Sequence, residues 1–194
     1  WDIHAMETFQ IQANNGNLDG KWFNLYSQIS RCNAALRVLN KADEKEVPVK
    51  ASRIAEMKVL RSHFYFELVR LFNQVPYFDE NVPESEYVNV GNDVYTREQH
   101  LDRIANELIE ASKSLPDRQA EVGRINKNIA LAYAAKVRLY QAYEQDPETH
   151  AVVNINKTLL REVVSLIDQV KGYDLLSDFQ QLDLVEYENG VESV

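Results

Sequence analysis

The 194-residue sequence has few of the features that would identify its chemistry directly. Its single cysteine, Cys32, excludes an internal disulfide and a metal site built from several thiolates. It contains no apolar run of about 18 residues, so no segment is expected to span a bilayer, and none reads as a signal peptide. Its 21 Lys and Arg are outnumbered by 30 Asp and Glu, and the net charge of −9 argues against binding nucleic acid or anionic lipid.

Motifs for metal binding and catalysis are also missing. His4, His63, His100 and His150 are scattered and never form the H-x-x-x-H or H-E-x-x-H spacing, so no zinc is expected. There is no G-x-S-x-G, no phosphate-binding glycine loop and no Cys–His pair in a catalytic context. The acidic stretch 79–93 has oxygen ligands for calcium but lacks EF-hand spacing, which favours a solvated loop. We therefore predict neither a metal nor a cofactor.

The strongest positive signal is helical periodicity from Lys50 to Phe72. A helix here has one apolar face with Arg61 in its middle, and a second, weaker apolar side. A helix covered from two directions belongs inside a stack of helices, and its buried arginine requires carboxylate or carbonyl partners. Val75-Pro76 ends the helix. The main face consists of Ile54, Met57, Phe64, Tyr65, Leu68 and Phe72, and the second side of Val59, Phe66 and Val69.

Four further helices are predicted from the same spacing. The first covers Lys21 to about Ala42, with Asn33 on its apolar face. The third follows a capping box at Thr96, the fourth is capped by Asn126, and the fifth covers about Thr158 to Lys171 with Gly172 just beyond its end. The predicted apolar rows are Leu101, Ile104, Leu108 and Leu115 in the third helix, Ile129, Tyr133, Val137 and Tyr140 in the fourth, and Leu160, Val163, Ile167 and Val170 in the fifth.

Irregular segments separate these helices. Residues 1–20 are expected to form a polar turn region, and residues 73–95 a long irregular connection of a kind that usually has a function or packs as an excursion. No series of strands with regular alternation appears. The sequence predicts an all-α fold, a tetratricopeptide-like stack of antiparallel helix pairs with long irregular loops, although the strict repeat signature is not met.

Several ordered segments resemble one known family, the SusD/RagB-like outer-membrane proteins. The pattern from Trp22 through Tyr26 and Ile29 to Asn33 is similar to the signature of the family's first stacked helix. The stretch 60–76 resembles its second motif, in which an arginine (Arg61) precedes an aromatic run that includes Tyr65 and a turn ending in Val-Pro (Pro76). Asn73 stands where the family has glycine. Weaker matches follow at 123–127 (with Arg124), 172–175 and 189–194.

The resemblance implies a binding protein rather than an enzyme. Members of this family sit as lipoproteins on the outer-membrane surface and cap a SusC-like TonB-dependent transporter. They capture oligosaccharides, or peptides in some members, and pass them to the channel. Family chains are considerably longer than this one, and it begins at Trp1 rather than at methionine. We therefore expect residues 1–194 to be the N-terminal helical part, with the lipid anchor and the C-terminal half absent.

The resemblance also places part of the ligand surface in the loops before the first helix. The candidate ligand-binding residues there are Trp1, Asn14, Asn15, Asn17 and Asp19. A plain polar loop is an equally good interpretation of the same residues. The motif residues are assigned structural roles instead, with Arg61 tying helix ends together and Trp22 and Tyr26 belonging to the core. The motif residues with predicted structural roles are Trp22, Tyr26, Asn33, Arg61, Tyr65, Pro76 and Arg124.

Two other function classes stay open. A tetratricopeptide-like scaffold that binds only protein would have no sugar affinity and a groove lined by helix faces. A glycoside hydrolase on a helical frame would need two carboxylates facing each other with separated pKa values. No spacing in the sequence places two carboxylates across a common cleft.

Overall fold

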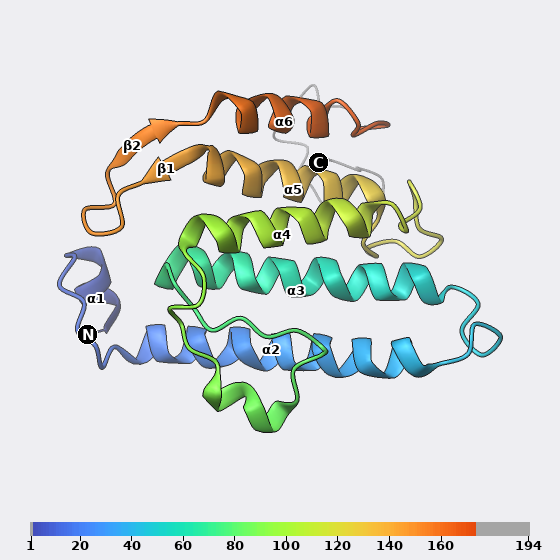
Figure 1. The fold of residues 1–194 in the computed structure, drawn as a ribbon, viewed down its shortest axis with the longest axis horizontal. Coiled ribbons are helices and arrows are strands. Elements are labelled where there is room, and N and C mark those ends of the chain that lie inside the picture. Colours follow the sequence, from blue (N-terminus) through green and yellow to red (C-terminus); the bar gives the residue numbers. More distant parts are fainter. Residues whose placement is uncertain (1, 174–194) are drawn as a thin grey trace, which may run out of the picture.

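The computed structural model describes residues 2–173 and shows helices stacked in chain order (Figure 1). Each of the long helices packs against the one before it. This confirms the predicted all-α, tetratricopeptide-like architecture. The elements are α1 (Asp2–Glu7), α2 (Gly16–Lys41), α3 (Lys50–Phe72), the 3-10 helix η1 (Glu84–Asn89), α4 (Arg97–Ser112), α5 (Lys127–Ala142), β1 (Tyr143–Gln145), β2 (Val152–Ile155) and α6 (Lys157–Ile167).

Side-chain caps fix where the helices begin. Thr96 and Gln99 form the predicted capping box of α4, and Asn126 caps α5 as expected. The prediction for α2 was wrong by five residues, because Asn15 accepts hydrogen bonds from the backbone nitrogens of Asn17 and Leu18 and starts the helix at Gly16. The polar turn region predicted for residues 1–20 also contains the short helix α1.

The core is centred on α3, which lies between α2 and α4. Tyr65, Phe66 and Leu68 are completely buried, which confirms that α3 is covered from two directions. The relative weight of its two sides was predicted wrongly. Phe66 and its neighbours on the side expected to be weaker are buried, whereas Ile54 and Met57 on the main face remain partly exposed.

Alanines rather than large side chains form the buried face of α5. Ile129 is 44% exposed and Tyr140 is 36% exposed, so two of the four residues predicted to face the core do not. Ala130 and Ala134 lie one turn apart beside that row, and the sequence predicts that they permit close approach of a neighbouring helix; both are completely buried. Their small side chains allow α5 to pack against both α4 and α6, so this expectation is confirmed although the larger row was assigned to the core.

The C-terminal end of the described chain differs from the prediction in three ways. A short antiparallel hairpin, β1–β2, occupies part of a segment predicted to be loop without strands. Helix α6 ends at Ile167, which is 48% exposed, and only Leu166 is buried within this helix. Gly172 has a φ of +81° but lies five residues beyond that end rather than next to it. Helix α4, earlier in the chain, also ends before the last residue of its predicted apolar row, at Ser112 rather than at Leu115.

The irregular excursion of residues 73–96 runs along α2 before returning to α4, and it contains η1 (Figure 1). Motif side chains hold it by its backbone. The Tyr26 hydroxyl donates to the Pro76 carbonyl at 2.8 Å, and the Asn33 amide donates to the Phe78 carbonyl at 3.2 Å. The Tyr65 hydroxyl donates to that same carbonyl and accepts from the Phe78 nitrogen, at 2.7 and 2.9 Å.

Arg61 completes this junction. Its side chain is 3% exposed, and its guanidinium forms ion pairs with Glu80 of the excursion and Glu107 of α4. It also donates to the Asn33 side-chain oxygen of α2 at 2.7 Å. One arginine of α3 therefore joins α2, α4 and the excursion, with the carboxylate partners that its buried position requires.

Candidate ligand-binding site

The candidate ligand-binding residues lie at the end of the stack where α2 begins. Trp1 falls outside the described residues. Asn14, Asn17 and Asp19 are exposed around the first turn of α2. Asn15 differs from them, because it is 5% exposed and its amide also donates to the Asp2 carbonyl at 3.1 Å. Its polar atoms therefore hold α1 and α2 together.

One of these residues, Asp19, lines a hollow beside the start of α2. We call it the α2 hollow. It has a volume of about 560 Å³ and is bounded by the segment before the helix, the first turns of α2 and the last residue of α3. Its lining residues are Ile11, Gln12, Ala13, Leu18, Asp19, Trp22 and Phe72.

Trp22 also lines a second depression, the aromatic groove, between α2 and the excursion. This groove has a volume of about 540 Å³. Phe23 and Val88 at its rim are 68% and 89% exposed, so it presents apolar surface to solvent. Sequence reasoning missed Phe23 and Phe72 as surface-lining residues; the position of Phe23 off the apolar row was the available signal. The groove is lined by Trp22, Phe23, Tyr26, Ser27, Ser30, Arg31, Pro76, Phe78, Tyr87 and Val88.

Packing fixes the rings around these depressions. The Trp22 ring meets Phe72 edge to face at 4.9 Å and lies tilted against Tyr26 at 4.8 Å. Burial raises the pKa of Tyr26 far above its usual value, so its hydroxyl keeps the proton that it donates to Pro76. Trp22 was predicted to be a core residue; it packs against the core and is also partly exposed to both depressions.

The α2 hollow combines the groups that suit a polar ligand with apolar faces. Trp22 and Phe72 offer aromatic surface, while the Gln12 amide and the Asp19 carboxylate accept hydrogen bonds from hydroxyl groups. Sugars have this mixture of apolar faces and hydroxyl edges. In the described part of the chain, no three His, Cys, Asp or Glu side chains are placed to hold a metal ion.

Glu80 and Glu107 are two carboxylates that the fold brings to one group, and the pair does not resemble a hydrolase site. Both carboxylates bind the same arginine, Arg61. Burial raises the pKa of Glu80, but the hydrogen bond and charge of Arg61 together lower it to below its usual value. A general acid in a glycosidase needs a raised pKa, so this pair serves to neutralise Arg61.

The remaining motif residues also serve packing. Arg124 forms an ion pair with Glu56, whose side chain is 5% exposed, and its Nε donates to Glu56 at 3.3 Å. This bond joins the loop before α5 to α3. Among residues 2–173, no helix is long and apolar enough to cross a membrane.

The stacked helices and the excursion that Tyr, Asn and Arg side chains fasten to them define a tetratricopeptide-like fold. A family model described as SusD-like, starch-binding and associating with the outer membrane matches residues 2–139. The chain belongs to this SusD-like family, as the motifs from Trp22 to Pro76 predicted.

Comparisons with individual relatives support the same family assignment. A SusD-like protein from Bacteroides ovatus is 26% identical over 191 residues, which is 97% of this chain and 34% of the relative. A crystal structure with a xylogluco-oligosaccharide is 26% identical with a TM-score of 0.72, covering 94% of this chain and 35% of the other. A laminarin-binding SusD-like protein is 25% identical with a TM-score of 0.65, covering 88% and 35%. The chain thus spans about a third of the length of these relatives.

Proposed function

We propose that the protein captures oligosaccharides without cleaving them, and that the α2 hollow forms part of its binding surface. The observation that carries this proposal is the presence of Trp22, Phe72, Gln12 and Asp19 around one hollow, at the end of the stack where the sequence predicted ligand contacts. Solved relatives described with a xylogluco-oligosaccharide and with laminarin support a glycan as the ligand class.

The 194 residues act in this proposal as the N-terminal helical part of a longer binding protein. Their length relative to the relatives supports this, as does the match of the family model to residues 2–139. Other loops of the longer protein would then complete the site. The candidates for direct contact with the ligand are Asn14, Asn17 and Asp19 among the described residues, and Trp1 outside them.

The protein acts at the outer-membrane surface as a lipoprotein and delivers its ligand to a SusC-like TonB-dependent transporter. The family description, which names association with the outer membrane, supports this location. The helical stack is the proposed contact surface for the transporter. The family description, which names starch binding, supports capture without catalysis.

A polysaccharide screen of the full-length protein, followed by calorimetry on any ligand found, tests the proposal. Asp19→Asn alters only the α2 hollow and Phe23→Ala only the aromatic groove, whereas Trp22→Ala alters both. We expect Asp19→Asn and Trp22→Ala to weaken glycan binding about tenfold or more, by loss of a charge-assisted hydrogen bond or of ring contact. Trp1→Ala and Asn17→Ala test the remaining candidates.

Each outcome is decisive for one part of the proposal. Binding that survives Asp19→Asn but fails in Phe23→Ala would move the site to the aromatic groove. Release of shortened sugars would contradict non-catalytic capture. If the folded protein binds no glycan at all, the alternative of a scaffold that binds only protein replaces the proposal.

A further inference from the structure

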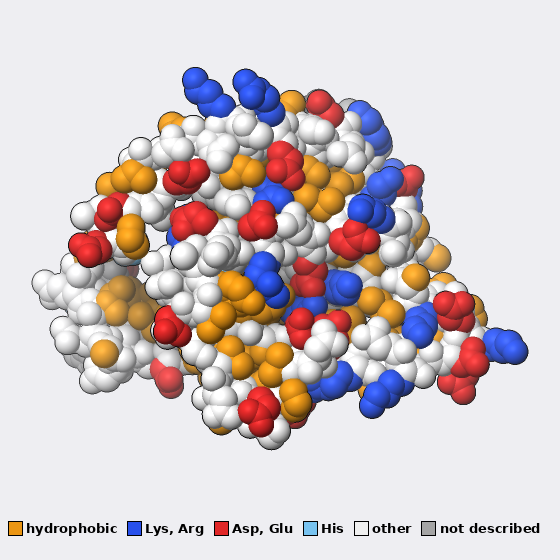
Figure 2. All heavy atoms as spheres, viewed as in Figure 1, with side chains coloured by type: hydrophobic (Ala, Val, Ile, Leu, Met, Phe, Trp, Pro, Cys, Tyr) orange, Lys and Arg blue, Asp and Glu red, His pale blue; other side chains and the backbone are white. Residues whose placement is uncertain are grey.

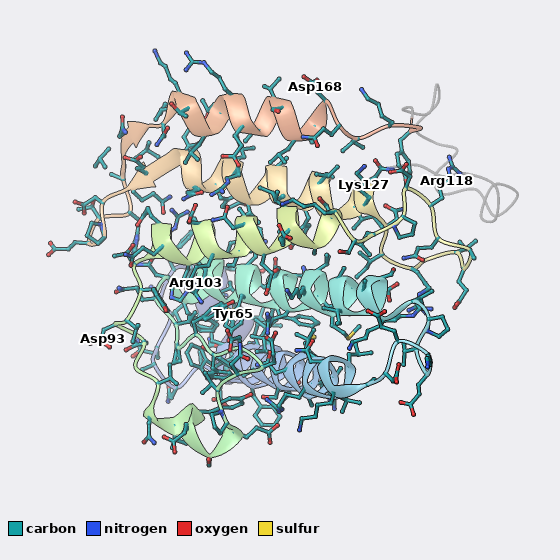
Figure 3. All side chains as sticks on the ribbon, turned by 45° about the vertical axis from the view of Figure 1, so that its right-hand side comes forward. Tyr65, Asp93, Arg103, Arg118, Lys127 and Asp168 are labelled. Carbon is teal, nitrogen blue, oxygen red and sulfur yellow. The ribbon has the colours of Figure 1, made fainter. Side chains whose placement is uncertain are left out.

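Among the described arginines that are at least partly buried, Arg103 of α4 is the one without an acidic partner. Its guanidinium lies over the rings of Tyr77 and Tyr95, at 4.4 and 4.7 Å from their centres. Its Nε is buried without a hydrogen-bond partner, and no ion pair joins it to any residue in the described range 2–173. Figure 3 shows Arg103 projecting from α4 toward the excursion.

The contrast with two other arginines is informative. Arg138 of α5 forms ion pairs with Asp102 of α4 and with Glu162 of α6. Arg70 lies over two rings as Arg103 does, at 5.5 Å from Phe66 and 5.4 Å from Tyr140, but it is paired with Glu67 at 2.7 Å. At Arg70, stacking on two rings therefore accompanies an acidic partner and does not replace it.

Arg103 lines a hollow of about 390 Å³, which we call the Arg103 hollow. Figure 2 shows hydrophobic side chains gathered over the excursion, with basic side-chain atoms beside them. The two carboxylates of the hollow each form an ion pair with another arginine, Glu98 with Arg97 at 3.3 Å and Asp102 with Arg138 at 2.6 Å. The hollow is lined by Tyr95, Glu98, Gln99, Asp102, Arg103 and Gln141.

A stacked guanidinium that keeps its donors available is a receptor for a planar or tetrahedral anion. The two tyrosine rings hold the side chain in place, which reduces the entropy lost when it binds a ligand. Arginine pairs with carboxylate and sulfate oxygens through two parallel N–H bonds, whereas neutral sugar hydroxyls form only weaker single bonds. The uncommitted charge therefore favours ligands that carry an anionic group.

We propose that the Arg103 hollow binds an acidic sugar residue of the glycan, through a carboxylate or a sulfate ester. This inference deepens the proposed function and rests on it, because it assumes that the ligand is a glycan. Tyr95 supplies ring surface and the exposed Gln99 supplies an amide nitrogen for the rest of such a sugar, whereas the Gln141 amide is already bonded to Arg138 and to the Glu98 backbone.

The test compares matched glycans on the full-length protein. The first pair is homogalacturonan with free and with methyl-esterified carboxyl groups, and the second is galactan with and without sulfate esters. We expect at least one acidic member to bind about tenfold more tightly than its neutral counterpart, with a preference that weakens as salt screens the charge. Arg103→Gln should abolish the preference without abolishing binding of the neutral glycan.

Arg70→Gln is the matched control, because it also removes an arginine from two aromatic rings, but one that already has an acidic partner. It should leave the preference unchanged, and thermal unfolding of both variants checks that they fold. An acidic preference that persists in Arg103→Gln, or binding of neutral glycans only, would overturn the inference and leave the proposed function intact. Failure to bind every glycan would overturn both.

Discussion

Arg61 shows how a charge is accommodated in the centre of this fold. Its two carboxylate partners, Glu80 and Glu107, are themselves only 12% and 15% exposed. Their ion pairs were required by the sequence, since an arginine on an apolar helix face cannot lose its proton. The identity of the partners was not predictable, because Glu80 lies in the irregular excursion and Glu107 in another helix.

Removing this charge should therefore be costly. In Arg61→Met, two nearly buried carboxylates and the Asn33 oxygen lose their partner, and we expect a loss of about 3–5 kcal/mol of unfolding free energy in urea titration. Arg161→Met is the control, because Arg161 is exposed on α6, and it should change stability by less than about 0.5 kcal/mol. A change of similar size in both variants would contradict a structural role for Arg61.

His100 provides a pH-dependent test. Burial lowers the pKa of its completely enclosed ring to about 4, assisted by the charge of Arg103 and opposed in part by the Val75 backbone. The unfolded chain, with a pKa of about 6.5, binds this proton first. Stability is therefore fully present above about pH 6.5 and falls as the pH drops toward 4.

His100→Leu should remove this part of the pH dependence. We expect the wild type to lose about 2 kcal/mol more than the variant between pH 7.5 and 5, measured by urea unfolding. The pKa of His63 is also lowered, chiefly by burial, so both proteins retain some dependence on pH. Parallel stability curves for the two proteins would show that His100 does not titrate as described.

Among the elements, α5 differs most from its prediction. The fourth helix was recognised from its Asn126 cap and its period, but its buried face was assigned to the larger side chains. Helix spacing alone fixes which residues share a face; which face is buried depends on how closely the neighbours approach. Between α4 and α6 this closeness selects Ala130 and Ala134.

Enlarging a buried alanine tests this arrangement. Ala134→Leu adds three carbon atoms where no space is left, and we expect a loss of about 1–3 kcal/mol or more, seen as a lower unfolding temperature. Ile129→Ala removes atoms from a side chain that is 44% exposed and should change stability by about 0.5 kcal/mol or less. A larger loss of stability in Ile129→Ala than in Ala134→Leu would instead indicate that the predicted row of larger side chains is the buried face.

Across the whole molecule, long-range packing is distributed unevenly. Helices α3 and α5 each contribute nine buried residues, whereas α1 has none and α6 has one. Hydrogen exchange should therefore be slowest in α3 and α5, and fastest in α1 and the β1–β2 hairpin, whose β2 residues are exposed. Mass spectrometry of deuterated peptides measures this order. Protection of the hairpin equal to that of α3 would contradict it.

The sequence was most informative where local rules govern structure. Caps at Thr96 and Asn126, the period of α3 and the motifs from Trp22 to Pro76 were sufficient for the fold class and the family. Of the described ligand-binding candidates, only Asp19 lines the α2 hollow. Its wall also includes Phe72, the last residue of α3, and no sequence pattern places Phe72 beside the start of α2. The Arg103 hollow has no sequence signature at all, since its character depends on which carboxylates are already paired.

The way the excursion is fastened has a consequence for protein engineering. Tyr26, Asn33 and Tyr65 bind the main chain at Pro76 and Phe78. A side chain that binds a carbonyl group fixes the path of a loop whatever that loop's own residues are. Beyond Glu80, whose carboxylate Arg61 also requires, the segment can thus accept new residues while its attachment to the scaffold stays the same.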